Sequence, residues 1–460
     1  MNKYLVILLA VLSSTELQAQ SLKSVPKLVV DITIDQLRND LLEQYASMYS
    51  PNGFNRLTSQ GVVYESANYP FSPIDPASAI ASLSTGSTPH YNNIVGTKWL
   101  NRLTLRPTGC VEDSKYGASP ARLATSTIGD ELKISTQGAA IVYGVAEKPE
   151  WAVLSAGHAA DAAFWKDEVT KKWTTSSYYS SDSKKWIDSY QRLYGEARQN
   201  NTNEEICKLA INCVRSKALG RDAVTDFLSV TLSAGNEIKA ESNYLSLDRT
   251  LADFISQVES EIGKDNVLFI VTSTGCDDEV KTNYAEYKVP TGVFYINRTA
   301  NLMNIYLSAI YGQGRYVEGC FRNEIFLNRQ LIDQKHLSLD DVLGRSQEFL
   351  FQNSGVRDVY TSTQLLRGGD DVAKLHYGYN ADNSGDIIVN INPGWQLNNE
   401  ETGENHTFRM GTLSFPIIFY GAGLQHQRVV TPVSVDRIAP TIAKAIRIRA
   451  PNACTAEPLF

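Results

Sequence analysis

The sequence predicts an α/β protein in which helices cover both faces of a mostly parallel central sheet. Apolar runs such as Leu28–Ile34 and Val267–Val271 are typical of strands that are buried on both faces. Stretches with helical periodicity follow several of these runs. Asp35 stands directly after the first run, and ligands of open α/β sheets bind at the carboxyl ends of strands. Asp35 is therefore a candidate metal ligand or acid/base group.

Strand and helix candidates alternate over much of the chain. The first strand is followed by a predicted helix over Gln36–Tyr45, and the strand Phe227–Leu232 by an amphipathic helix over Tyr244–Ile262. The other predicted elements are the strands Ala139–Val145, Ile387–Ile391 and Pro416–Phe419 and the helix Val435–Ala445. This alternation favours a layered α/β sheet over an all-α or all-β protein.

The segment at about 291–368 has a different character. It is rich in helical patterns, over Ala300–Tyr311 and Leu339–Gln352, and we expect it to form an inserted lobe beside the sheet. With 460 residues, the chain exceeds what one ordinary core requires. The prediction is one large domain over 21–460 that includes this lobe.

Composition excludes some partners. Hydrophobic residues make up 43% of the chain and charged residues 20%, as in ordinary globular proteins. The net charge of -7 argues against nucleic-acid binding and offers no general attraction for phosphate polyanions.

Residues 1–20 have the pattern of a secretory signal peptide. Lys3 gives a positive start, Tyr4–Leu12 a short apolar core, and Leu17 and Ala19 a cleavage site. The apolar core is too short to span a membrane, and no later segment approaches ~20 apolar residues. The residue directly after the predicted cleavage site is not a cysteine, so we expect no lipoprotein anchor. The mature protein is predicted to be soluble and exported, to the periplasm, the cell surface or the medium.

An even number of cysteines permits disulfides in an exported protein. The six are Cys110, Cys207, Cys213, Cys276, Cys320 and Cys454. Cys207 and Cys213 can pair if the chain turns between them, or they can share a helical segment unpaired. A structural zinc site is not expected, because the sequence has no CxxC motif and no Cys/His cluster.

Nine motifs carry a family resemblance. They are Lys27–Arg38, Gly53–Gly61, Ser82–Trp99, Ser126–Leu132, Leu154–Trp165, Tyr316–Arg329, Val359–Gly368, Gly378–Trp395 and Thr431–Asn452. In this order they resemble the alkaline phosphatase superfamily, in its type I phosphodiesterase/nucleotide pyrophosphatase branch. They are most similar to exported phosphate-irrepressible alkaline phosphatases of Bacteroidetes. The resemblance implies a three-layer α/β/α sandwich with an inserted cap or lobe. It also implies two zinc ions and a Thr or Ser nucleophile, which the metals activate.

At most of the positions where the family has metal ligands, this chain has residues of other types. Asp35 matches the first metal-binding Asp, although a strand-end Asp can equally cap the following helix. The remaining ligand positions fall on Asn236, near Ala240, and on Thr274, Gly275 and Ser414. None of these is a usual zinc ligand.

The nucleophile position falls on Pro76, which has no hydroxyl group and cannot attack phosphorus. Ser78 and Asp75 are neighbours that could serve if the loop has shifted. The favoured interpretation is that both are turn or helix-cap residues.

Positions that contact the phosphoryl group in relatives are also changed. Lys148 matches the Lys of a Lys-x-Arg pair, whereas Glu150 stands in place of the Arg. Its negative charge would repel a phosphate oxygen by several kcal/mol in a partly desolvated site. Thr97 stands where some relatives have Asn.

A rebuilt site would need ligands from elsewhere. Cys276, Asp277 and Asp278 follow the third matched strand, and His406 lies upstream of Ser414. For Cys276 the favoured interpretation is an ordinary buried or disulfide cysteine, and for His406 a solvated side chain. His158 is expected to be a packed polar residue.

Only Asp35 remains of about six family ligands, while catalytic zinc typically needs three protein ligands. The sequence therefore predicts a pseudoenzyme, an exported binding or assembly protein without a cofactor, whose partner is an unidentified protein or small ligand. The alternative is a zinc-dependent phosphate mono- or diester, or sulfate ester, hydrolase with a rebuilt site. A third hypothesis is glycan binding, suggested by 23 Tyr and 6 Trp residues.

Overall fold

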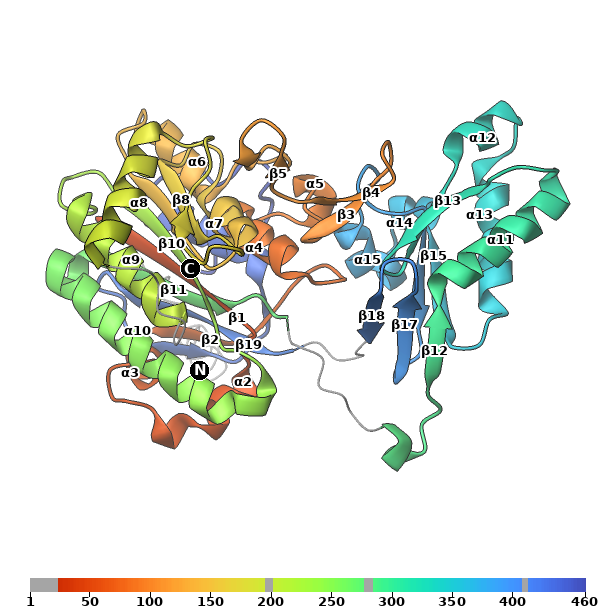
Figure 1. Ribbon diagram of the computed structural model, residues 1–460. Helices are drawn as coiled ribbons and strands as arrows, with labels where there is room; N and C mark the ends of the chain where they lie inside the picture. The colour runs from red at the N-terminus through yellow and green to blue at the C-terminus, as the bar shows by residue number, and fades with distance from the viewer. Residues whose placement is uncertain (1–23, 195–201, 277–283, 408–412) are drawn as a thin grey trace, which may run out of the picture.

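A computed structural model describes residues 24–194, 202–276, 284–407 and 413–460. A ten-stranded sheet with helices on both faces forms its larger part, and a smaller lobe lies beside it (Figure 1). The predicted three-layer α/β/α sandwich around a mostly parallel sheet is confirmed. The predicted signal peptide, 1–20, lies outside the described residues.

The central sheet has the strand order β20-β2-β19-β11-β1-β10-β7-β8-β9, and β21 pairs with β2. β1 lies between β10 and β11, parallel to both, whereas β19 is antiparallel to its two neighbours. The strands are β1 Leu28–Asp35, β2 Val62–Asn68, β7 Val142–Val145, β8 Ala162–Lys166, β9 Trp173–Thr174, β10 Asp226–Ser233, β11 Val267–Ser273, β19 Phe415–Gly421, β20 Gln427–Val429 and β21 Val433–Ser434. The carboxyl ends of β1, β10 and β11 therefore meet at one edge of the sheet.

Alternate residues of β1 pack into two different hydrophobic cores, one on each face of the sheet. Val30, Ile32 and Ile34 pack under one helix layer, and Val29 packs under the other. The first layer comprises α2 Asn39–Gln44, α3 Phe54–Gln60, α9 Thr202–Ser216 and α10 Ala240–Ile262. The second layer comprises α4 Pro76–Thr85, α6 Ile128–Ser135, α7 Pro149–Ala156 and α16 Ile438–Ala445. Burial on both faces explains why the strand is almost continuously apolar.

The helix after β1 begins later than predicted. The prediction was Gln36–Tyr45, whereas α2 begins at Asn39, because Gln36 has a φ of 63° and turns the chain out of the strand. The Tyr244 hydroxyl holds this turn by accepting from the Arg38 amide (2.9 Å) and donating to the Gln36 carbonyl (3.2 Å). The N-cap residue of α2 is Arg38, whose side chain makes no capping hydrogen bond, so Asp35 does not stand at the N-cap position.

The smaller lobe contains two further sheets, with the strand orders β12-β17-β18 and β13-β14-β16-β15. Its elements are β12 Gly292–Tyr295, α11 Ile296–Tyr311, β13 Val317–Phe321, β14 Glu324–Leu327, α12 Arg329–Gln334, α13 Leu339–Phe351, β15 Val356–Thr361, α14 Ser362–Arg367, α15 Ala373–Gly378, β16 Ile387–Ile391, β17 Trp395–Asn399 and β18 Glu404–Thr407. The predicted strand Ile387–Ile391 exists, but in this lobe and not in the central sheet. The lobe sheets thus extend past the predicted range of 291–368.

Ion pairs and hydrogen bonds join the lobe to the sandwich. Arg102, from the loop between β3 (Lys98–Asn101) and β4 (Arg106–Gly109), binds the fully buried Asp386 carboxylate at 2.9 Å. Arg329 of the lobe binds the same carboxylate at 2.6 Å. Asn380 donates to the Asn93 side chain at 2.8 Å, beside α5 (Pro89–Asn92). A buried, doubly paired carboxylate of this kind fixes the lobe against the sandwich.

None of the six cysteines forms a disulfide with another described cysteine. Cys207 and Cys213 are buried on the same helix, α9, which decides between the two alternatives in favour of an unpaired helical segment. Among the described helices, none is long and apolar enough to cross a membrane.

The α4-facing side of β1 is polar in its interior. Asp31 lies opposite Ser229 of β10, and Thr33 lies opposite Thr231. The hydroxyls of Ser229 and Thr231 are buried without a hydrogen-bond partner among the described residues. Asp31 is only 5% exposed, and burial raises the pKa of its carboxyl to about 7.

Asp31→Asn tests this interior. A carboxyl whose pKa is higher in the folded than in the unfolded chain stabilises the fold in its protonated form. The free energy of unfolding therefore falls as the pH rises from the unfolded-state pKa to the folded-state pKa. We expect the free energy of unfolding of the wild type to fall between pH 4 and pH 8, and the substitution to remove on the order of 2–4 kcal/mol of that fall. Urea unfolding at both pH values measures it, with the exposed Asp253→Asn as control. If the free energy of unfolding of Asp31→Asn depended on pH as steeply as that of the wild type, the raised pKa of Asp31 would be contradicted.

Candidate functional site

Asp35 and Thr274 meet at the edge where parallel strands end. Asp35 closes β1, and Thr274 follows β11, the neighbouring strand. The Thr274 hydroxyl donates to Asp35 Oδ1 at 2.6 Å, and both side chains are buried. Two of the predicted ligand positions are thus joined to each other by a hydrogen bond.

Gly275 lies in a space that admits no side chain. Its φ is +66°, a conformation that residues with a side chain rarely adopt. A Cβ atom there would lie 2.8 Å from the Phe415 ring and 2.9 Å from the Tyr69 ring. Tyr69 is itself fixed, because its hydroxyl donates to the Ser273 carbonyl at 2.9 Å. In this packing a histidine cannot replace Gly275 without displacing two aromatic rings.

The other two predicted ligand positions lie nearer the surface. Ser414 is exposed, and its hydroxyl accepts from the Asn39 side chain at 3.0 Å. Asn236 is exposed in the loop after β10, where its carbonyl accepts from the Asn243 side chain at 3.4 Å. Both positions have local polar contacts of the kind that stabilise loops.

The nucleophile position is the beginning of a capped helix. Pro76 is the first residue of α4, where a missing amide proton costs nothing. Asp75 precedes it as the N-cap and accepts from the Ala77 amide at 3.0 Å. Ser78 completes the capping box, exchanging hydrogen bonds with the Asp75 backbone. The Ser78 hydroxyl is therefore buried and engaged, as the helix-cap interpretation expects.

Asp75 also ties the lobe to this helix. Its Oδ1 accepts from the amide and the hydroxyl of Thr97, both at 2.7 Å. Its Oδ2 pairs with Arg322 at 2.9 Å, across 247 positions of sequence. Arg322 lies at the turn between β13 and β14, and its guanidinium passes so close to Gly96 that a Cβ there would lie 2.9 Å from Nη1. The ion pair covers the place from which a nucleophile would act.

The residues at the start of α7 have little positive charge to offer an anion. The Lys148 ammonium lies 4.4 Å from the centre of the Trp151 ring. Burial raises the pKa of Glu150; Lys148 opposes this effect, and the Asp75 charge adds to it. The Glu150 carboxyl therefore offers a phosphate group no positive charge here, and the charge of Asp75 is paired with Arg322.

The candidates for relocated ligands lie apart or outside the described residues. Cys276 is half-buried, and its thiol lies 3.7 Å from the Thr274 carbonyl. Asp277 and Asp278 belong to a segment outside the described residues. His406 lies in β18, opposite Leu397 of the lobe sheet. Within the described part of the chain, no three His, Cys, Asp or Glu side chains cluster as a metal ion would require.

His158, the predicted packed histidine, joins α6 to the loop after α7. Its Nδ1 donates to Asp130 Oδ2 at 3.0 Å, and its Nε2 to the Leu123 carbonyl at 2.9 Å. Two acceptors require both ring nitrogens to carry protons, and the Asp130 contact raises the pKa of His158. Burial by itself would raise the pKa of Asp130. Hydrogen bonds from His158, Thr127 and Ala159 outweigh this effect, so the pKa is lowered overall. This ion pair stabilises the fold and does not face Asp35.

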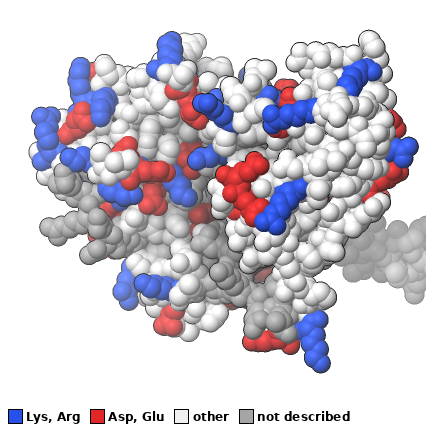
Figure 2. Space-filling model, turned by 45° about the vertical axis from the view of Figure 1, so that its right-hand side comes forward, with Lys and Arg blue, Asp and Glu red and all other residues white. Residues whose placement is uncertain are grey.

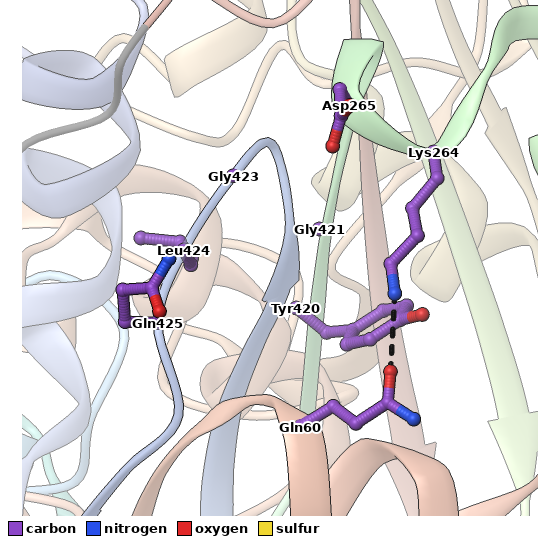
Figure 3. A pocket seen from close by; sticks show the side chains of 8 residues that line it. All are labelled: Gln60, Lys264, Asp265, Tyr420, Gly421, Gly423, Leu424 and Gln425. Atoms are coloured by element: carbon purple, nitrogen blue, oxygen red, sulfur yellow. Dashed lines mark hydrogen bonds between the residues drawn. The ribbon is translucent and has the colours of Figure 1, made fainter.

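A cavity of about 260 Å³ lies at the opposite edge of the sheet, where β11 begins and β19 ends (Figure 3). Lys264 reaches across it to the Gln60 amide oxygen at 3.1 Å, with its ammonium 5.4 Å from the centre of the Tyr420 ring. Leu424 and Gln425 line the other side. The lining contains no Ser, Cys or His, and the Lys264 ammonium is engaged by Gln60 and the Tyr420 ring.

The arrangement of strands, capped helix and lobe matches a known family. Residues 29–412 match the family model described as type I phosphodiesterase / nucleotide pyrophosphatase. The chain belongs to this family. The match spans both the sandwich and the lobe, which agrees with the resemblance stated from the motifs.

Individual relatives are distant but cover nearly the whole chain. Alkaline phosphatase PafA of Elizabethkingia meningoseptica is 26% identical, over 94% of each chain. A Myroides odoratus protein named calcium-transporting ATPase is 28% identical, over 98% of this chain and 96% of its own. The crystal structure of PafA superposes with a TM-score of 0.84 at 24% identity, over 95% of this chain and 98% of its own. Murine ectonucleotide pyrophosphatase / phosphodiesterase 5 superposes with a TM-score of 0.55 at 13% identity, over 92% of this chain and 95% of its own.

Arg322 had no assigned role in the sequence, although it lies within a matched motif. Nothing local marks it, because its partner Asp75 is 247 positions away. The packing of Gly275 was equally hidden, since the two rings that enclose it come from Tyr69 and Phe415. Only the ladder of β11 with β19 and of β19 with β2 brings these rings to the end of β11.

Thr274→Val tests whether Thr274 supports the Asp35 carboxylate. The substitution keeps the shape of the side chain and removes the donor, which leaves a buried carboxylate oxygen with one hydrogen bond fewer. We expect the free energy of unfolding to fall by about 1.5–3 kcal/mol. Urea unfolding measures the loss, and the exposed Thr104→Val should change it by less than about 0.5 kcal/mol. Equal effects of the two substitutions would show that the hydrogen bond contributes nothing.

Asp75→Ala tests the capped helix. It removes the N-cap acceptor and both Thr97 contacts and leaves Arg322 without its partner, so we expect a loss of about 2–4 kcal/mol. Arg322→Gln removes only the part-buried ion pair and leaves the other hydrogen bonds of Asp75 in place, so it should cost less, about 1–2 kcal/mol. Thermal unfolding of both variants measures which substitution causes the larger loss of stability. A larger loss for Arg322→Gln than for Asp75→Ala would contradict the assignment of Asp75 as the centre of this contact.

Proposed function

We propose that this protein is a catalytically silent, exported member of its family, which retains the fold as a binding or assembly protein. The observation that carries the proposal is the end of β11, where Thr274 bonds to Asp35 and Gly275 is enclosed by two rings. A family enzyme needs a carboxylate and an imidazole at these two positions. Here the space for the imidazole is filled by Tyr69 and Phe415.

The described residues do not fit two zinc ions. Zinc prefers imidazole, thiolate and carboxylate ligands, and a catalytic ion typically takes three from the protein. Around Asp35, the family positions offer the Thr274 hydroxyl, a glycine and the exposed Ser414 hydroxyl. Hydroxyl groups are weak ligands for zinc, and one carboxylate does not replace the missing set. We therefore expect no cofactor.

The helix start supports the same proposal. Pro76 offers no nucleophile, and the neighbouring Ser78 hydroxyl is buried within a capping box. Asp75 is occupied by Thr97 and Arg322. The Glu150 carboxyl, with Lys148 directed over a ring, offers a phosphoryl group little attraction.

The proposed partner is a protein or a small ligand. The net charge of -7 makes nucleic acid an unsuitable partner. Export is proposed from the pattern of residues 1–20, which would be removed on secretion.

One experiment decides between this proposal and a hydrolase with a rebuilt site. Purified mature protein is analysed for metals and assayed on aryl phosphate mono- and diesters and an aryl sulfate, beside the Elizabethkingia meningoseptica alkaline phosphatase as positive control. We expect far less than one equivalent of zinc, no turnover above buffer, and the same melting temperature with and without EDTA.

Asp35→Ala completes the experiment as the matched variant. Under the proposal it lowers stability but changes no activity, because Asp35 acts only within the fold. Roughly two equivalents of zinc, together with turnover that Asp35→Ala abolishes, would overturn the proposal and establish a metal-dependent hydrolase.

A further inference from the structure

The cavity between the start of β11 and the end of β19 contains a rigidly held aromatic residue. Tyr420 is one of its lining residues and is only 1% exposed. The Tyr420 hydroxyl donates to Glu259 Oε1 at 3.0 Å, and the same carboxylate binds the Arg56 guanidinium at 2.7 Å. That guanidinium also lies 5.2 Å from the centre of the Tyr420 ring. This part of the cavity is therefore fixed before any ligand binds.

A tight turn brings the main chain to the cavity. Gly421, Ala422 and Gly423 have φ values of 93°, 48° and 72°. Gly421 admits no side chain, because a Cβ atom there would lie 2.3 Å from the Val267 carbonyl oxygen. Gly421 and Gly423 both line the cavity, and the Gly423 amide donates to no other described residue. The turn thus leaves a backbone donor beside the cavity.

Two opposite charges line the cavity without pairing with each other. Lys264 and Asp265 are neighbours in the chain and both are exposed. Lys264 donates instead to the uncharged Gln60 amide oxygen at 3.1 Å, and no described residue binds the Asp265 carboxylate. Figure 3 shows the Asp265 carboxyl at one end of the cavity and the Lys264 side chain directed away from it, toward Gln60. A donor charge and an acceptor charge are thus held apart around one space.

We propose that this cavity binds a small zwitterion of the α-amino acid class. Lys264 and the Gly423 amide bind its carboxylate, and Asp265 binds its ammonium group. A simple anion would meet the charge of Asp265 and a simple cation that of Lys264, so a ligand that carries both charges is preferred to either. The volume of about 260 Å³ lies below the range of cavities for drug-sized ligands and suits a molecule of this size.

Other ligand classes fit the cavity less well. A sugar would offer only uncharged hydroxyls to two charged side chains, and the Tyr420 ring is too buried for a sugar to pack against it. Figure 2 shows acidic and basic side chains intermingled over the face that it draws, without a broad patch of one sign. With a net charge of -7, the chain has no general attraction for a large anion, so the local charges of the cavity decide which ligand binds.

The location of the cavity makes the proposal independent of the catalytic question. The cavity lies at the edge of the sheet opposite to the one where Asp35 and Thr274 meet. Zwitterion binding there holds whether or not the site at Asp35 is catalytic. Because both charged side chains are exposed, we expect a modest affinity, with a dissociation constant of about 0.1–1 mM.

Isothermal titration calorimetry on the full mature chain tests the proposal, with L-alanine, L-leucine and L-glutamine as probes. We expect at least one of the three to bind in this range. The N-acetyl form of the tightest probe lacks the ammonium charge, and its methyl ester lacks the carboxylate charge. Each of these two forms should bind at least about tenfold more weakly than the free amino acid.

Lys264→Gln and Asp265→Asn should each weaken binding of the free amino acid at least about tenfold. Asp265→Asn should also bind the N-acetyl form more tightly than the wild type does, because it removes the charge that repels an anion. A residue that only supported the fold would not change the preference in this way. The matched controls are Lys185→Gln and Asp182→Asn, which change an ion pair of α8 (Ser181–Tyr194) that is 76% and 82% exposed and should leave binding unchanged.

The outcomes separate the alternatives. Each variant is first required to melt at the wild-type temperature, which the exposure of both positions favours. A wild type that binds none of the three amino acids at about 10 mM, or binding that Lys264→Gln and Asp265→Asn leave unchanged, would overturn the proposal. Acetate or D-glucose that bound more tightly than the amino acids, with binding weakened by the same variants, would also overturn it and assign the cavity to a simple anion or to a sugar.

Discussion

The constraint on which the site depends is the packing at the carboxyl end of β11. The chain leaves the strand through Thr274, whose hydroxyl binds Asp35, and then through Gly275 with a positive φ between two aromatic rings. Tyr69 comes from the loop after β2, and Phe415 begins β19, so three segments of the sheet enclose one glycine. Interiors packed this closely do not absorb a larger side chain without displacement of their neighbours. A ligand set cannot be restored here by one substitution.

A second constraint acts from the lobe. Arg322 reaches Asp75 at the start of α4, and Arg102 and Arg329 meet at the buried Asp386 carboxylate. Two carboxylates, one on each side of the boundary, thus bind guanidinium groups from the other side. Charge-assisted hydrogen bonds of this kind hold a fixed geometry. Under the proposed function, the boundary between lobe and sandwich is a structural joint that these ion pairs hold.

The sequence predicted the architecture because periodicity is a local property. Leu28–Ile34 and Val267–Val271 were correct as buried strands, since apolar runs of this length report burial on both faces. The late start of α2 was missed, because Tyr244 fixes the turn at Gln36 from 208 positions away. The strand Ile387–Ile391 was correct in its bounds but assigned to the wrong sheet, because an apolar strand does not encode its neighbours. The Asp75–Arg322 pair was out of reach for the same reason.

The two carboxyls of β1 lie in different environments, which bears on how Asp35 is interpreted under the proposed function. Asp31 and Asp35 lie on the same face of the same strand, and both are 5% exposed. Asp31 has no described partner, and burial raises the pKa of its carboxyl to about 7. Asp35 accepts a hydrogen bond from the Thr274 hydroxyl, which satisfies one of its carboxylate oxygens. Under the proposed function, this hydrogen bond helps to keep the buried acid compatible with the fold without a metal ion, and Asp35 acts as a packing residue.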